Sequence, residues 1–351
     1  HFGSSHFAHA SSAQVTPQAS QSFEAAVVSA FHSQPRSRMA WRFAALGLFQ
    51  LVTHASAIDA YSCVEGDPLA NAAIQVLNPD RIPDNEYYVT RLKATDGTYE
   101  VYFKLPSAQI GYDRVNACGI SPEDSKMYCL FKHSGVGYLA RFDSTVDGSS
   151  SGIEYVAKAP EWGPAGAFAM DGNYYLANGK KLMSITKPDS LPGYPTHTNP
   201  SLSNLVRLPN ANKASGFDIN IVLQDLDGTG VQGWAVSIKD GVVRAAGANG
   251  AMCEMTSSAD PIPSKDFGAA WSFDGALYYS CNDGTSGVFS VELSDRVCAS
   301  GGSKQALVKV VGSSEKTSRN DGMNCMKLDP PPWPPVPTPA PTPAPTPEPT
   351  Q

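Results

Sequence analysis

A short phrase of small and apolar residues recurs about every fifty residues, and this period restricts the fold more than any other feature of the chain. The copies begin at Asn116, Gly166, Gly216, Gly268 and Asp321, so that successive starts lie 50, 50, 52 and 53 residues apart. A fixed period of this length is typical of repeat proteins in which one supersecondary unit packs on the next, and β-propellers are the leading example.

Each repeat is predicted to contain four short strands, because runs of aromatic and β-branched residues alternate with Asp-Gly and Gly/Ser turns. Asp171-Gly172 and Asp274-Gly275 have the composition of tight hairpin turns. The strands expected in the four internal repeats are 116–120, 127–131, 138–142 and 153–157; 167–170, 174–177, 181–185 and 205–208; 217–222, 234–238, 241–244 and 251–255; and 269–273, 277–281, 288–293 and 306–311.

The two ends of the repeat region complement each other. Residues 320–326 supply a first strand with no partner after it, whereas residues 61–64, 87–92 and 99–105 supply three strands with no first strand before them. Pairing these ends closes a ring and protects the open sheet edges. We therefore expect one all-β domain over residues 58–328, a six-bladed β-propeller of four-stranded blades whose N-terminal strands pair with the C-terminal strand.

The cysteines favour disulfides over zinc, because all seven follow residue 57 and none forms a CxxC pair. Cys118 and Cys129 are predicted to face each other across two antiparallel strands, and Cys63 and Cys325 hold the matching positions in the closing unit. A Cys63–Cys325 bond would fasten the ring and contribute about 5 kcal/mol in a loop-entropy description.

The three other cysteines leave one thiol over. We expect Cys281 to pair with Cys298, which leaves Cys253 unpaired. The alternative is that some of these three are buried free cysteines.

The flanks of the repeat region indicate secretion. Met39 is the first methionine, and residues 39–57 combine a basic start, a ten-residue apolar run and an A-x-A site, which are the three parts of a signal peptide. Residues 1–38 are then interpreted as an upstream, non-native leader. Residues 329–351 are rich in proline and threonine, and this composition predicts an extended stalk or linker.

The charge balance excludes two classes of partner. The chain has 26 Lys and Arg against 33 Asp and Glu, a formal net charge of −7, and without residues 1–57 the value is −9. A nucleic acid or an anionic membrane surface calls for a basic patch.

No segment after residue 57 has the eighteen apolar residues of a membrane span. We expect a secreted or cell-surface protein whose partner is an extracellular glycan or protein.

Two local motifs suggest chemistry only weakly. Residues 148–152 match the G-x-S-x-G pattern of a nucleophile elbow, but they connect two strands, whereas that elbow joins a strand to a helix. Asp225, Asp227 and Thr229 resemble the start of a calcium loop, but the terminal bidentate acid is missing. A turn between strands is the favoured interpretation of the second motif, and no catalytic residue is expected in either.

A propeller usually binds its ligand over the central channel, where the first strands of the blades begin. The polar residues expected there are Asn116, Asp218, Asp266, Asn320 and Asp321. Several oxygen donors on one axis can hold calcium. Such a site would be similar to that of six-bladed lactonase-like hydrolases, in which a channel metal polarises the substrate carbonyl. The alternative is that these residues cap strands and bind channel water.

Three phrases resemble the blade motifs of a family of uncharacterised secreted β-propeller domains found in bacterial and algal surface proteins. They are residues 138–143, 167–175 and 287–291. The resemblance covers residues 60–328 and implies the fold and an extracellular location. The family has no assigned active site. We therefore expect a non-catalytic recognition or adhesion module on a stalk. The alternatives are a calcium-dependent, lactonase-like hydrolase and a structural wall or coat component.

Overall fold

The computed structural model describes residues 61–67, 69–78, 86–106, 111–146, 152–159, 162–178, 182–197, 205–207, 218–284, 286–318 and 320–334. These residues belong to one compact unit. The predicted signal peptide, residues 148–151 of the Ser/Gly motif and the proline-rich residues from 335 onward lie outside them. No helix in the described part of the chain is long and apolar enough to cross a membrane.

Twenty strands and two 3-10 turns make up the described secondary structure, which contains no α-helix. The strands form five antiparallel units of four, and each unit is named here by its strands. Unit 1 contains β20 (Asn320–Met323), β1 (Ala73–Leu77), β2 (Tyr87–Leu92) and β3 (Tyr99–Leu105); unit 2 contains β4 (Arg114–Ile120), β5 (Met127–His133), β6 (Val136–Phe142) and β7 (Glu154–Lys158).

The other three units follow in chain order. Unit 3 contains β8 (Ala165–Phe168), β9 (Tyr174–Ala177), β10 (Leu182–Ile185) and β11 (Leu205–Arg207); unit 4 contains β12 (Asn220–Val222), β13 (Trp234–Lys239), β14 (Val242–Gly247) and β15 (Met252–Ser257); unit 5 contains β16 (Phe267–Phe273), β17 (Ala276–Cys281), β18 (Val288–Glu292) and β19 (Gln305–Gly312). The predicted strands of the internal repeats are thus confirmed, with ends that shift by a few residues.

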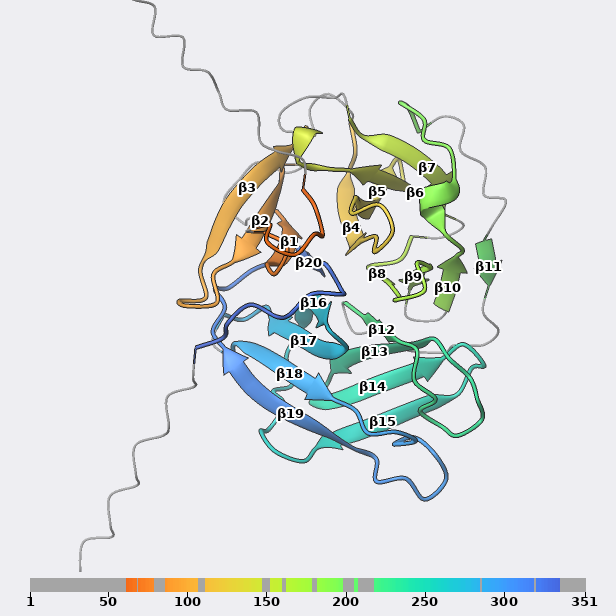
Figure 1. Cartoon of the computed structure of the whole chain (residues 1–351), viewed down its shortest axis with the longest axis vertical. Helices are drawn as coiled ribbons and strands as arrows, with labels where there is room; N and C mark the ends of the chain where they lie inside the picture. Colours follow the sequence, from red (N-terminus) through yellow and green to blue (C-terminus); the bar gives the residue numbers. More distant parts are fainter. Residues whose placement is uncertain are drawn as a thin grey trace, which may run out of the picture. The chain divides into compact units, whose positions relative to one another are not determined.

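The first strands of the five units contact one another in a cycle, β4 to β8, β12, β16, β20 and back to β4 (Figure 1). Five buried apolar clusters lie between neighbouring units and complete the same cycle. Alternation of side chains along each strand makes this possible, because opposite faces of one sheet pack on different neighbours. On β5, for example, Cys129 and Phe131 face unit 1, whereas Tyr128 and Leu130 face unit 3. The arrangement is propeller-like.

The expected number of six units is not confirmed, because the described residues supply five. Each unit carries one copy of the repeated phrase on or beside its first strand, and the phrase occurs at five places in the sequence. The strands at the two ends of the repeat region belong to a single unit, since β20 pairs with β1. The ends therefore add one unit to the four internal ones.

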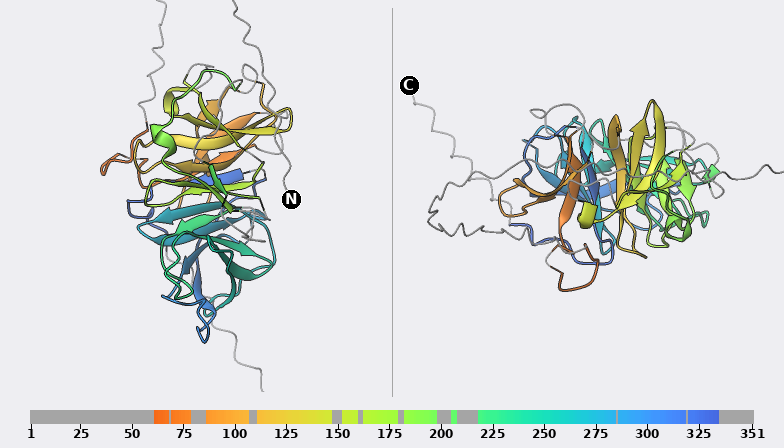
Figure 2. Two further views of the ribbon diagram at one scale, coloured as in Figure 1. Left: turned by 90° about the vertical axis from the view of Figure 1, so that its right-hand side faces the viewer. Right: turned by 90° about the horizontal axis from the view of Figure 1, so that it is seen from above.

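Ring closure uses a different strand from the one expected. Residues 61–63 are not a strand, and the partner of β20 is β1, which pairs with it antiparallel between Ile74↔Met323 and Leu77↔Asn320. Cys63 nevertheless forms the predicted disulfide with Cys325, at a Cα–Cα distance of 5.4 Å. Figures 1 and 2 show the result, with the blue β20 beside the orange strands of unit 1.

The second predicted disulfide is confirmed, and the third is wrong. Cys118 and Cys129 are bonded within unit 2, whereas Cys298 bonds with Cys253 and leaves Cys281 as a buried free thiol. The segment after β18 crosses to unit 4, where the Cys298 amide donates to the Leu226 carbonyl at 2.7 Å. Strands β15 and β19 also pair in parallel at this point, which joins units 4 and 5 into one eight-stranded sheet.

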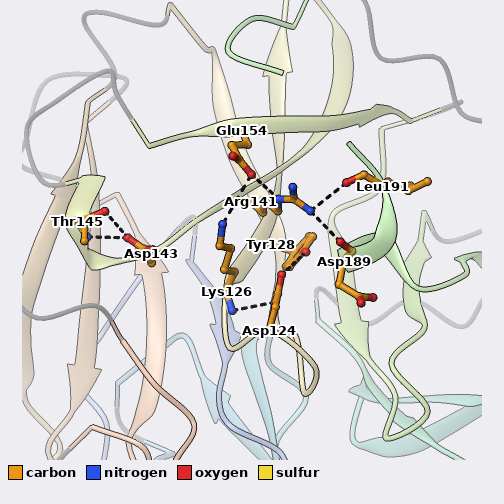
Figure 3. Close-up of polar contacts among 9 residues, drawn as sticks. All are labelled: Asp124, Lys126, Tyr128, Arg141, Asp143, Thr145, Glu154, Asp189 and Leu191. Atoms are coloured by element: carbon orange, nitrogen blue, oxygen red, sulfur yellow. Dashed lines mark hydrogen bonds and ion pairs between the residues drawn. The ribbon is translucent and has the colours of Figure 1, made fainter. Parts of the chain in front are cut away.

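Residues 186–197, here called the strap, run from unit 3 back over unit 2. Arg141 on β6 fastens the strap (Figure 3), because its guanidinium donates to Glu154 at 2.6 Å and to the Asp189 and Leu191 carbonyls at 3.2 and 3.1 Å. Further along, Tyr194 forms an isolated antiparallel bridge with Tyr155 on β7. The strap thereby adds polar contacts to the apolar packing between units 2 and 3.

The first residues of the proline-rich segment also pack on the ring. The Trp333 indole stacks on Tyr278 with ring centroids 5.8 Å apart, and it lies over Gly312, where an added Cβ would meet the indole at 2.9 Å. Pro331 is buried in the same region. Packing on the propeller-like ring therefore continues past Leu328, the last residue expected in the domain.

Candidate ligand site at one end of the ring

The structure separates the five polar residues expected at the channel. Asp218 and Asp321 are fully buried at the centre of the ring, each with 1% of its surface exposed. Asn116 and Asp266 line a pocket where the first strands of the units begin. Asn320 is buried, and its side-chain amide donates to Gln75 Oε1 at 3.3 Å.

Asp218 connects three first strands through its carboxyl group. Its Oδ1 accepts from the Ile219 amide at 2.8 Å, and its Oδ2 accepts from the Ala270 amide at 2.7 Å and the Gly322 amide at 3.0 Å. Asp321 Oδ2 accepts from the Ala117 amide. The two carboxyl groups thus hold β12, β16, β20 and β4 together, which replaces the backbone pairing that first strands of neighbouring units lack.

Other side chains close the centre of the ring more tightly. Asn324 forms two hydrogen bonds with the backbone of Ser272, at 2.9 and 2.7 Å, and the Tyr174 hydroxyl donates to the Ala117 carbonyl. A Cβ on Gly322 would overlap the backbone of Ala270, so only glycine fits between β20 and β16. Protein atoms therefore fill the centre of the ring where these residues lie.

The pKa values of both carboxyl groups are raised. Burial raises the pKa of Asp218 to about 8, and burial together with the Asp218 charge raises the pKa of Asp321 well above the ordinary carboxyl range. Asp321 Oδ1 accepts no hydrogen bond from the described residues. A protonated Asp321 that donates to Asp218 accounts for this arrangement, since two buried carboxylates in contact cannot both ionise.

This pair does not fit a calcium site. Calcium takes six to eight oxygen ligands whose lone pairs face the ion. Here backbone N–H groups occupy both oxygens of Asp218 and one oxygen of Asp321. No group of three or more His, Cys, Asp or Glu side chains with metal-binding geometry occurs among the described residues.

The predicted calcium loop has the geometry of a turn. Asp225 accepts from the amides of Gly228 and Gly230 at 2.8 and 3.0 Å, and Asp227 accepts from the Thr229 amide at 3.0 Å. The second oxygen of Asp227 accepts from the Asn249 side chain at 3.2 Å. Each carboxylate oxygen in this loop thus has a protein donor.

A pocket of about 510 Å³ opens where the first strands begin, and it is called the channel-end pocket here. Its size lies within the range of small-molecule sites. Residues just before or at the start of β4, β8, β16 and β20 and just after β17 supply its walls. The side chains used below are Arg114, Asn116, Trp162, Lys265, Asp266, Asn282, Asp283 and Lys316.

Sequence reasoning missed most of this pocket. It named Asn116 and Asp266 but not Trp162, Arg114 or Lys316. A signal was present for these three residues, because each of them lies within five residues before a copy of the repeated phrase. Alignment of the repeats on the phrase would have placed these positions at the same end of the ring.

These observations define an all-β repeat protein whose units close on themselves. The chain belongs to the family described as a repeat of unknown function (DUF6923), whose model matches residues 88–327. No curated protein matches the chain. Among solved structures it is similar to a bifunctional GH43-CE protein of Bacteroides eggerthii, at 17% identity and a TM-score of 0.26, over 72% of this chain and 36% of that one. That likeness is too low to carry an argument about fold or function.

Proposed function

We propose that the chain is a secreted or cell-surface recognition module, a five-bladed β-propeller whose channel-end pocket binds an extracellular glycan without altering it. The observation that carries the proposal is the pocket itself, which combines the half-buried Trp162 with the amide side chains of Asn116 and Asn282. Aromatic rings that are apolar on the face and polar at one edge, set beside a few polar groups, are typical of binding sites for small polar ligands.

The polar chemistry of the pocket favours binding over hydrolysis. The Asp283 carboxylate accepts from the Ser286 amide at 3.0 Å and the Ser286 hydroxyl at 3.1 Å, and Asp266 is exposed to solvent. In glycoside hydrolysis the general acid is a carboxyl group whose raised pKa keeps it protonated. The two buried carboxyl groups whose pKa values are raised, Asp218 and Asp321, are bonded to the backbone at the packed centre of the ring. Neither His133 nor His197 is among the pocket's lining residues.

The proposal is tested by retention of the full-length protein on a panel of immobilised neutral and acidic polysaccharides. We expect retention on at least one of them, and an affinity loss of about tenfold or more for Trp162→Ala, the range of a stacked aromatic contact. Tyr194→Ala is the matched control, because this exposed tyrosine lies in the strap and does not line the pocket.

Three results would contradict the proposal. The first is retention on no polysaccharide. The second is equal retention of wild type and Trp162→Ala. The third is release of new reducing ends or acyl groups from the bound polysaccharide, which would establish hydrolysis.

A further inference from the structure

We propose that the channel-end pocket selects an acidic sugar residue, one that bears a carboxylate or a sulfate. This inference rests on the proposed function and adds the chemical class of the ligand. It starts from three cationic side chains that line the pocket: Arg114 at the start of β4, Lys265 in the segment before β16 and Lys316 in the segment before β20.

These three cations have no carboxylate partner among the residues that the structure describes. Arg114, Lys265 and Lys316 are exposed, and no ion pair involves them. Elsewhere on the ring some cations are paired, Arg91 with Glu100 at 2.6 Å and Lys104 with Glu86 at 2.7 Å, whereas others such as Lys309 are not. What distinguishes the pocket is that three unpaired cations line one cavity of a protein whose net charge is −7.

The two acids in the pocket do not cancel these cations. Hydrogen bonds from Ser286 occupy both oxygens of Asp283. Asp266 supplies one exposed carboxylate. Three cations against two carboxylates leave an excess of one positive charge at the rim, and hydrogen bonds from Arg or Lys to an anion are about twice as strong as neutral ones.

Trp162 supplies the surface on which a sugar ring would lie. The Lys132 ammonium lies 5.5 Å from the centroid of its indole, a cation–π distance that fixes the ring and brings a fourth cation beside it. A Cβ added at Gly137 would meet the indole at 3.4 Å, an ordinary contact distance, so β6 lies beside the ring. The indole is thus supported from the protein side before any ligand arrives.

Asn116 supplies a hydrogen-bond acceptor for a hydroxyl group. Its Oδ1 is buried and accepts no hydrogen bond from the described residues, although the side chain lines the pocket. Such an oxygen costs free energy until a donor reaches it. A ligand with hydroxyl donors, an apolar ring face and one negative charge satisfies Asn116, Trp162 and the cations together. An acidic peptide offers the charge but lacks the hydroxyl-bearing ring.

The test compares ligands of equal length by isothermal titration of the full-length protein. The probes are an oligogalacturonate, a sulfated dextran oligosaccharide, the unsulfated dextran oligosaccharide and polyglutamate. We expect one or both acidic sugars to bind about tenfold or more tightly than dextran, since one charge-assisted hydrogen bond is worth about that factor. They should also bind more tightly than polyglutamate, which has no sugar ring to lie on Trp162. The uronate and sulfate arms identify which anion is preferred.

Charge variants test whether the three cations cause the selectivity. Lys265→Gln with Lys316→Gln should lower the affinity for the acidic sugar about tenfold or more and leave that for dextran unchanged. Lys309→Gln is the control, because this exposed lysine on β19 does not line the pocket. Trp162→Ala should lower the affinity for acidic and neutral sugars alike.

The outcomes distinguish this inference from the function on which it rests. Equal affinity for acidic and neutral sugars, together with a loss of affinity in Trp162→Ala, would overturn the acidic selectivity. It would leave the proposed glycan-binding function standing. Equal binding of polyglutamate and the acidic sugars would replace the sugar site with a general polyanion site. Binding of no sugar would overturn both proposals.

Discussion

Asp218 and Asp321 are both buried at the centre of the ring, and between them they bind the backbone of four of the five first strands. We therefore expect the stability of the ring to depend on the protonation state of these two side chains. This dependence has a definite sign, because both pKa values are raised in the folded state.

The first prediction concerns alkaline pH. A carboxyl group with a raised folded-state pKa contributes stability that is present in acid and is lost as the pH rises through that pKa. For Asp218 the window runs from the ordinary carboxyl range, about 4, up to about 8. We expect the free energy of unfolding, measured with denaturant, to fall between pH 5 and pH 9.

Asp321→Asn is the matched variant for this prediction. Its side-chain amide can donate to Asp218 at every pH, and its oxygen can still accept from Ala117. We expect the variant to lose less stability than wild type between pH 5 and pH 9. Parallel pH profiles for the two proteins would show that the carboxyl pair does not control the titration.

The second prediction concerns acidic pH and the strap. His133 and His197 are stacked with ring centroids 4.0 Å apart, and burial, followed by the proximity of His197, lowers the pKa of His133. A histidine with a lowered pKa loses stability as the pH falls below the ordinary value of about 6.5. The neighbouring Tyr155 hydroxyl contacts His133 Nε2 at 2.9 Å, and Asp113 opposes the shift.

We therefore expect amide hydrogen exchange in residues 192–197 to accelerate as the pH falls from 7 to 5, after correction for intrinsic rates. His197→Phe keeps an aromatic ring in the stack and removes the second cause of the lowered His133 pKa, so its strap should lose less protection at pH 5 than the strap of the wild type. If the variant and the wild type open equally, stacking of two ionisable rings is not the cause.

The third prediction compares two disulfides of different span. The Cys63–Cys325 bond closes a loop of 262 residues, whereas Cys118–Cys129 closes one of 11. Loop entropy assigns roughly 5 kcal/mol to the long loop and roughly 3 kcal/mol to the short one. We expect the double alanine variant at 63 and 325 to lose more stability in denaturant than the variant at 118 and 129. The reverse order would mean that local packing around Cys118 outweighs ring closure.

Much of the fold could be predicted because it depends on residues that lie close together in the sequence. Alternating aromatic and β-branched runs mark strands such as β5 and β17, and the repeated phrase marks the first strand of every unit. Positive φ at Asp274 and Gly275 confirms one predicted hairpin turn. The disulfide of unit 2 followed from the same local pattern, since both of its cysteines lie on adjacent strands.

The wrong predictions concern pairings that are determined by contacts between segments far apart in the sequence. Residues 73–77 form the closing strand because β20 pairs with them, and nothing near Cys63 in the sequence shows that choice. Cys298 bonds with Cys253 because the segment after β18 crosses to the neighbouring unit. Most of the pocket residues lie in irregular segments next to the ends of strands, which hydrophobic periodicity does not describe.

The last prediction concerns calcium. Binding to the native state alone would stabilise the protein by about 2.7 kcal/mol at a hundredfold excess over the dissociation constant. Both candidate sites have protein donors on their carboxylate oxygens, with Gly228 and Gly230 bonded to Asp225 and backbone amides bonded to Asp218. We therefore expect the same thermal unfolding midpoint in millimolar calcium and in chelator. A rise in calcium that Asp225→Asn abolishes would restore the loop as a metal site. A rise that survives this variant but disappears in Asp321→Asn would assign the ion to the centre of the ring, and the proton on Asp321 would then have to leave as calcium binds.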